Sequence, residues 1–284
     1  MLVTNANIIA DPTPGAESFI VPTRFSTMPA IDGDNPSSDT DEYQATGTRP
    51  YGQLAKWTIE NIGVIAPRIT SVHRLHCGRL SNNEKFKLWA HEWRLDALGA
   101  HVATCRMVLI QGSANEIINT WVFPAVPSHD PVFAAELIAM AGAPRLTFVD
   151  IQTPAIQHEC HPIRNQTLAL RNRFAEILSE EPPPEWAIAD SQGGYVFSRQ
   201  LAFDAFLTVQ DCYKHYFAAY LDTIFGETAS RTKRPEIACR RSLDRLRAYQ
   251  IHHMESSPGN VFLSKLFGVD WTNDFLEKFL FTLA

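Results

Sequence analysis

Four short apolar runs in the middle of the chain constrain the fold most. Each is rich in β-branched or aromatic residues, and turn-forming residues such as Pro124 and Gly142 separate them. Runs of this length and spacing predict an antiparallel meander. A further segment, residues 86–95, fits the pattern of either a strand or a helix, and we interpret it as another strand. The four runs are residues 105–111, 117–123, 132–138 and 145–151.

The remainder of the chain has the apolar spacing of helices. The segment 200–225 is long and amphipathic, and the segment 166–178 ends before a run of three prolines. Helices on both faces of the sheet would give an α/β fold, a three-layer α/β/α sandwich with a central, mainly antiparallel sheet. No glycine-rich phosphate loop occurs, which argues against a nicotinamide or flavin Rossmann site. The other predicted helices are residues 236–254, 260–266 and 272–283.

The charge distribution divides the chain into two parts. Residues 1–45 hold seven acids and one base, whereas the whole chain has a net charge of −6, so residues 46–284 sum to zero. We interpret residues 1–48 as an acidic, loosely ordered arm and residues 49–284 as a single domain. The acids argue against a transit peptide, and no signal or membrane-spanning pattern is visible. We expect a cytoplasmic protein, or a stromal one if its source is an alga.

The cysteines and histidines do not predict a metal site. The five cysteines are scattered without a Cys-x-x-Cys pair, which favours a reducing compartment over a disulfide framework. The run of His, Glu, Cys and His at 158–161 precedes a proline, and we interpret it as a polar loop.

Several stretches, in order and spacing, are similar to one family. IINTWVFP at 117–124 is followed by PVFAAELI at 131–138 and RLTFVDIQTP at 145–154. The tail SPGNVFLSKLFGVDW at 257–271, followed by FLEKFLF, completes the pattern. From about residue 80 to the end, the chain resembles the ferredoxin-dependent bilin reductases, which reduce linear tetrapyrroles.

The resemblance implies a particular chemistry. These enzymes hold no metal or flavin, and ferredoxin delivers electrons one at a time. The bound bilin becomes a radical, to which side chains donate protons. The family fold is an α/β/α sandwich that holds the bilin between the sheet and the C-terminal helices.

The resemblance also assigns the candidate catalytic residues. Glu136 takes the place of the family's central aspartate, and the related red chlorophyll catabolite reductases also have glutamate there. Glu136 stands in an otherwise apolar run of residues. Burial there would raise its pKa toward neutrality, although strand alternation also allows a solvated or ion-paired glutamate. Asn119 stands where phycocyanobilin-forming enzymes have histidine and phycoerythrobilin-type branches have asparagine. Ser257 replaces the family's second acid, and Glu255 or His253 is a candidate substitute.

Other residues are candidates for binding. Arg199 is a candidate partner of the bilin propionates, because the family places basic residues near that end. Asp150 fits either an active-site acid or a strand-end cap. Arg106 and Phe133, on the predicted strands, complete the expected bilin contacts.

A basic stretch near the predicted helix 236–254 is the candidate docking surface for ferredoxin. Such a stretch also fits a solvated helix surface, whereas the neutral remainder of the domain argues against nucleic acid. The docking residues we expect are Lys233, Arg234, Arg240, Arg241 and Arg245.

These observations lead to one functional expectation and two alternatives. We expect ferredoxin-dependent, two-electron reduction of biliverdin or dihydrobiliverdin by a monomer without a bound cofactor or metal ion. Haem oxygenase or a partner bilin reductase is a further candidate partner. The alternatives are a red-chlorophyll-catabolite-like reductase, which Glu136 favours, and a non-catalytic bilin carrier, which the loss of the second acid favours.

Overall fold

The computed structural model describes residues 49–65, 69–97, 100–125, 130–154, 163–225 and 236–282. Within these ranges, the side chains of residues 64, 65, 69, 75–77, 236–240 and 258 are not described. The predicted acidic arm and the loop at 158–161 both lie outside the described residues.

A seven-stranded sheet forms the middle layer, with its strands in sequence order and every neighbouring pair antiparallel. The four predicted strands and the ambiguous segment 86–95 are all present, so the predicted meander is confirmed. The strands are β1 (Ile69–Leu80), β2 (Phe86–Ala97), β3 (Ala100–Gly112), β4 (Asn115–Pro124), β5 (Val132–Met140), β6 (Ala143–Gln152) and β7 (Val196–Arg199).

Sequence reasoning missed the two edge strands and the helix α2 (Pro50–Ile65). In β1, the described side chains of residues 72–74 are exposed, so the strand lacks the alternation that marks a half-buried strand. Strand β7 has only four residues and pairs with β6 alone. Edge strands of this kind are short or polar, which limits unwanted pairing with other chains.

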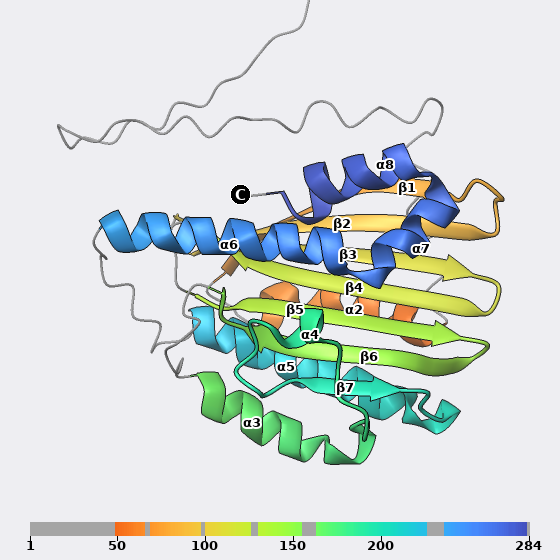
Figure 1. Ribbon diagram of the computed structural model, residues 1–284, viewed down its shortest axis with the longest axis horizontal. Coiled ribbons are helices and arrows are strands. Elements are labelled where there is room, and N and C mark those ends of the chain that lie inside the picture. Colours follow the sequence, from red (N-terminus) through yellow and green to blue (C-terminus); the bar gives the residue numbers. More distant parts are fainter. Residues whose placement is uncertain are drawn as a thin grey trace, which may run out of the picture. The chain divides into compact units, whose positions relative to one another are not determined.

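Helices cover both faces of the sheet, as Figure 1 shows, and the predicted three-layer sandwich is confirmed. The helices α6 to α8 lie on one face, and α2 and α5 lie on the other, where α3 packs against α5. No helix within the described ranges is long and apolar enough to cross a membrane. The helices are α2 (Pro50–Ile65), α3 (Ile163–Arg173), η2 (Ala175–Ile177), α4 (Glu185–Ile188), η3 (Phe203–Ala205), α5 (Phe206–Phe225), α6 (Glu236–Ser256), α7 (Pro258–Phe267), α8 (Val269–Phe275) and η4 (Leu276–Leu280).

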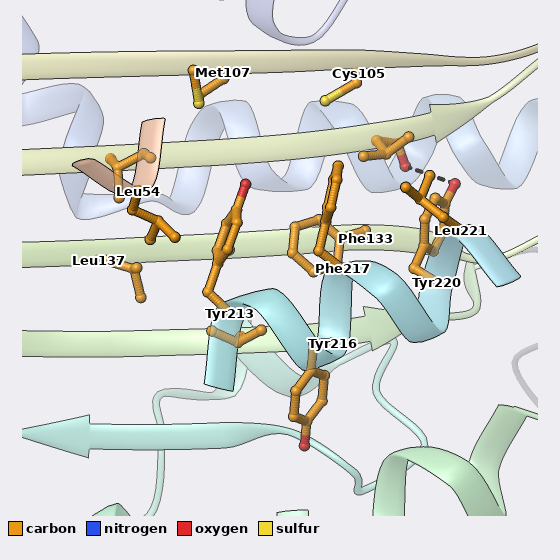
Figure 2. Packing of buried hydrophobic residues seen from close by; sticks show 14 of the residues in the cluster. Leu54, Cys105, Met107, Phe133, Leu137, Tyr213, Tyr216, Phe217, Tyr220 and Leu221 are labelled. Carbon is orange, nitrogen blue, oxygen red and sulfur yellow. Dashed lines mark hydrogen bonds between the residues drawn. The ribbon is translucent and has the colours of Figure 1, made fainter. Parts of the chain in front are cut away.

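The main hydrophobic core lies between the sheet and α5. Phe133 of β5 is fully buried there, with its ring 5.6 Å from that of Tyr213, 5.2 Å from that of Phe217 and 6.0 Å from that of Tyr220 (Figure 2). Because successive strand residues point to opposite faces, Phe133 is directed away from the α6–α8 layer. The expected bilin contact of Phe133 is therefore not supported, since this ring belongs to the core.

This packing predicts a large loss of stability on truncation. Phe133→Ala should lower the free energy of unfolding by about 3–5 kcal/mol, because the surrounding aromatic rings cannot collapse into the space left behind. Urea unfolding measures the change. Phe203→Ala is the matched control, since that ring is 70% exposed and its loss should change the stability little. Equal effects of the two substitutions would contradict this account of the core.

Candidate functional site

The face of the sheet opposite this core carries a row of side chains across three strands. Asn119 of β4 pairs directly with Glu136 of β5, which in turn pairs with Phe148 of β6. Side chains of directly paired residues lie on the same face, with Cβ atoms about 4.5–5.5 Å apart. The alternation therefore places the two candidate polar residues side by side beneath α7 and α8.

A cavity of about 150 Å³ lies between this row and the C-terminal helices. Its walls are almost entirely apolar, and the polar lining side chains are Asn119, Glu136, Ser257 and Asn260. The apolar lining residues are Val108, Ile110, Ile117, Trp121, Ile138, Met140, Leu146, Phe262, Leu263, Phe275, Leu280 and Phe281, and the backbone of Gly259 completes the wall.

Glu136 is the acid of this cavity. Its side chain is buried, and burial alone raises the pKa of its carboxyl to about 7. No ion pair or hydrogen bond to another described residue contributes to this pKa. A carboxyl in this state can hold a proton near neutral pH and release it to a group in the cavity.

Asn119 supplies a second polar atom that faces the cavity. Its Oδ1 is buried and has no hydrogen-bond partner among the described residues. An orphaned buried acceptor costs free energy, and such atoms in native structures commonly mark ligand or water positions. The amide can accept a hydrogen bond from a ligand N–H group and donate one to a ligand oxygen.

Ser257 lies at the opposite wall, where α7 begins. It is the N-cap of that helix, and its Oγ accepts a hydrogen bond of 3.3 Å from the backbone N–H of Gly259. The structure thus brings Ser257 into the same cavity as Glu136, although the two residues are 121 positions apart in the chain. A serine hydroxyl is a weak acid, so this position offers a hydrogen bond rather than an acidic proton.

The two candidate substitutes for the missing acid do not line the cavity. Glu255 is exposed at the end of α6. His253 is buried against the ring of Trp121, at 4.9 Å between ring centroids, and the pKa of its imidazole is lowered to about 3 by burial and by the neighbouring His252. His253 is therefore neutral at physiological pH, and neither residue is placed as a proton donor to the cavity.

Asp150 lies on the cavity side of the sheet but under α6. It is fully buried, and burial raises the pKa of its carboxyl to about 7, against smaller lowering effects of hydrogen bonds from Ser191, the Ile151 backbone and Gln152. Its Oδ1 accepts a hydrogen bond of 2.8 Å from the Ile151 N–H. Asp150 is not among the cavity residues, so the structure places it beside the site rather than in it.

Arg106 holds the C-terminal segment against the sheet. Its Nε donates to Glu92 Oε2 at 3.0 Å, and its Nη1 donates to the carbonyl oxygen of Thr282 at 2.7 Å. Its guanidinium is buried between the rings of Phe123 and Phe279. The expected bilin contact of Arg106 is not supported, because these internal partners engage the guanidinium.

Arg199, the candidate partner of the bilin propionates, lies beside the cavity. It pairs with Leu146, a lining residue, at the β6–β7 edge, and its guanidinium is about half exposed. Its Nη1 forms an exposed ion pair of 3.1 Å with Glu181. An exposed pair of this kind contributes little to stability and exchanges readily for another anion.

The basic candidates lie on α6 or before it. Arg241 and Arg245 are exposed and one helical turn apart, and together they define the basic face of α6. The side chain of Arg240 and the whole of Lys233 and Arg234 lie outside the described residues. Helix α6 belongs to the layer that covers the cavity side of the sheet (Figure 1).

Sequence reasoning missed most of the cavity lining, and Trp121 and Gly259 show why. Trp121 lines the cavity and lies two residues after Asn119 on β4. Residues two apart in a strand share a face, so strand periodicity alone places Trp121 on the face of Asn119. Gly259 lines the opposite wall, where a side chain added to it would approach Glu136. No local pattern marks that contact, because it depends on how α7 packs over the sheet. No cluster of three or more His, Cys, Asp or Glu suited to a metal ion occurs among the described residues.

Comparisons with known proteins agree with this geometry. The model of the ferredoxin-dependent bilin reductase family matches residues 79–282, so the chain belongs to that family. It is 23% identical over 213 residues to the phycoerythrobilin:ferredoxin oxidoreductase of Prochlorococcus marinus (strain MIT 9211), covering 71% of this chain and 79% of that relative. It is 27% identical over 212 residues to the 15,16-dihydrobiliverdin:ferredoxin oxidoreductase of Synechococcus sp. (strain WH7803), covering 68% and 80%.

The fold has a solved counterpart. The structure of phytochromobilin synthase from tomato in complex with biliverdin superposes with a TM-score of 0.69 at 17% sequence identity. The match covers 81% of this chain and 82% of the tomato chain. At this identity the likeness establishes the shared fold.

The raised pKa of Glu136 predicts a dependence of stability on pH. The folded protein holds the proton up to about pH 7, whereas the unfolded chain releases it near the ordinary value of 4.5. Glu136 therefore contributes stability below pH 4.5 that is lost as the pH rises to about 7. Over that range the wild-type protein should lose on the order of 3 kcal/mol relative to Glu136→Gln.

Urea unfolding of both proteins at several pH values measures this difference. Asp150 is present in both, so its own titration cancels from the comparison. A stability difference that stays constant from pH 4.5 to pH 7 would contradict the buried, uncompensated carboxyl.

Proposed function

We propose that this protein uses reduced 2Fe–2S ferredoxin to reduce one double bond of biliverdin or dihydrobiliverdin. The reaction adds two electrons and two protons and converts a C=C bond into CH–CH. Membership of the bilin reductase family and the names of the two relatives support the donor and the substrate class.

The observation that carries the proposal is a buried carboxyl, with a pKa raised to about 7, facing an apolar cavity. No ion pair with a described residue lowers the pKa of Glu136, so this carboxyl can hold a proton near neutral pH. The apolar cavity solvates charge poorly, so a radical anion of the substrate there would be a better base than in water. Asn119 beside it supplies the hydrogen bonds that orient a pyrrole N–H or a lactam oxygen.

The same lining supports a single two-electron reduction. Glu136 is the only carboxyl among the described cavity residues, and Ser257 offers a hydroxyl in place of the family's second acid. A single acid can protonate only the bilin atoms that lie close to it, and it must regain a proton before each further proton transfer. A second reduction at the far end of a tetrapyrrole would lie beyond that reach.

Substrate binding requires movement of the helical layer. Ligand pockets commonly enclose about 300–1,000 Å³, whereas this cavity measures about 150 Å³. The sheet side is a continuous hydrogen-bonded platform, so displacement of α8, with the first turn of α7 left in place over Glu136, is the less costly way to make room. The bilin propionates then extend toward the β6–β7 edge, where Arg199 can exchange Glu181 for a propionate.

Replacement of the acid should separate binding from chemistry. Glu136→Gln keeps the shape of the side chain, so it should bind biliverdin with little change. It lacks the proton and should stop after the first electron. In an anaerobic assay with reduced ferredoxin, product formation should fall at least about 100-fold, and a bilin radical should accumulate. Absorption and electron paramagnetic resonance spectra measure both.

The matched control is Glu255→Gln, which removes an exposed carboxyl from the same region and should leave the rate unchanged. Normal turnover by Glu136→Gln would overturn the assignment of the donor. A wild-type protein that binds biliverdin without consuming it would instead support a carrier.

The basic face of α6 predicts a salt-dependent encounter with ferredoxin. Arg241→Glu should lower the reduction rate several-fold at low ionic strength, and the difference should shrink as salt screens the charges. Lys56→Glu makes the same charge change on α2, on the other side of the sheet, and should have little effect. Equal slowing by both variants, or a rate independent of salt, would exclude α6 as the docking face.

A further inference from the structure

Gly259 is placed unusually close to the catalytic acid. A Cβ atom added to it would lie 3.3 Å from Glu136 Oε1 and 3.3 Å from Ser257 Oγ, closer than ordinary van der Waals contact. An alanine at this position would therefore displace a neighbour by a few tenths of an ångström.

The backbone conformation does not account for this glycine. Gly259 is the second residue of α7, and it is not among the described residues with positive φ, so any residue could adopt its conformation. Within a helix, glycine costs roughly 0.5–1 kcal/mol relative to alanine. The missing side chain, rather than conformational freedom, is what the site uses.

The length of the acid explains why space is needed there. Glu136 stands where the bilin reductases that this sequence resembles have aspartate, and glutamate is one methylene longer. The additional length carries the carboxyl away from the sheet, toward the first turn of α7. A Cβ on α7 would meet that carboxyl, whereas the shorter aspartate would not reach it.

The first turn of α7 also offers favourable surroundings for the spent acid. The N-terminus of a helix carries partial positive charge, and Ser257 Oγ lies at this turn as the N-cap. After Glu136 has given its proton to a carbon of the substrate radical, its carboxylate remains beside this turn. The same contact therefore sets the reach of the acid and lowers the cost of its anion.

We propose that Gly259 is a positioning residue for Glu136: the absence of a side chain on α7 makes room for the longer acid and fixes where its carboxyl lies. This inference rests on the proposed proton donation by Glu136. It makes Glu136 and Gly259 a matched pair contributed by the sheet and the helical layer.

A double-mutant cycle tests the pairing. Single-turnover rates with reduced ferredoxin are measured for wild type, Gly259→Ala, Glu136→Asp and the double variant. With Glu136 present, Gly259→Ala should slow proton transfer about tenfold, because small displacements of a catalytic group are costly. The bilin Kd should change less than about twofold.

In the Glu136→Asp background, the same Gly259→Ala substitution should change the rate less than about twofold, because the shorter carboxyl does not meet the new Cβ. Equal slowing in both backgrounds would overturn the proposal, since Gly259 would then act on the fold or on the bilin directly.

A second measurement does not depend on turnover. Infrared difference spectra against Glu136→Gln report the Glu136 carboxyl stretch, and its titration should shift to higher pH in Gly259→Ala, since the carboxyl is pushed from the helix end. An unchanged titration would show that Gly259 does not position the Glu136 carboxyl and would overturn the proposal. If the wild type fails to reduce any bilin, the proposed function fails, while this titration still decides whether Gly259 positions Glu136.

Gly63→Ala is the matched control for both measurements. Gly63 is a helical glycine on α2, and its added Cβ would lie at an ordinary 3.7 Å from Ser71 Oγ. This variant should leave the rate and the carboxyl titration unchanged. Changes equal to those of Gly259→Ala would show that the effect is general to helical glycines and would overturn the proposal.

Discussion

The register between β4 and β5 is the constraint on which the site depends. It places Asn119 directly opposite Glu136 and turns both toward the helical layer of α6 to α8. A shift by one residue would turn Glu136 into the aromatic core and Phe133 into the cavity. The packing of Phe133 against α5 therefore specifies the register, and with it the position of the acid.

The helical layer is fixed to the sheet by polar contacts as well as by packing. Arg106 forms a buried ion pair with Glu92 and donates a hydrogen bond to the carbonyl oxygen of Thr282, which holds the segment after η4 against β3. An arginine with these partners ties one edge of the helical layer that covers the cavity to the sheet.

Periodicity explains which parts of the molecule were predictable. Alternation over residues 105–151 correctly predicted the central strands. Glu136 and Asn119, which interrupt apolar runs, are the two polar side chains that line the cavity from the described part of the sheet. The edge strand β1 was missed because its described residues 72–74 are exposed and show no alternation, and β7 was missed because four residues are too few to show a period. The internal partners of Arg106, Glu92 of β2 and the carbonyl oxygen of Thr282, could not be predicted because they are distant in sequence.

Contacts between the layers set the limit of sequence reasoning at the site. Whether a polar residue near the start of α7 reaches the sheet depends on the path of α6, so Ser257 lines the cavity while Glu255, two residues earlier, is exposed. An acid on a rigid sheet can be located from its strand, but its reach and its pKa are set by the helix that covers it. In this protein the covering residue beside the acid is Gly259, whose missing side chain leaves space for the carboxyl of Glu136.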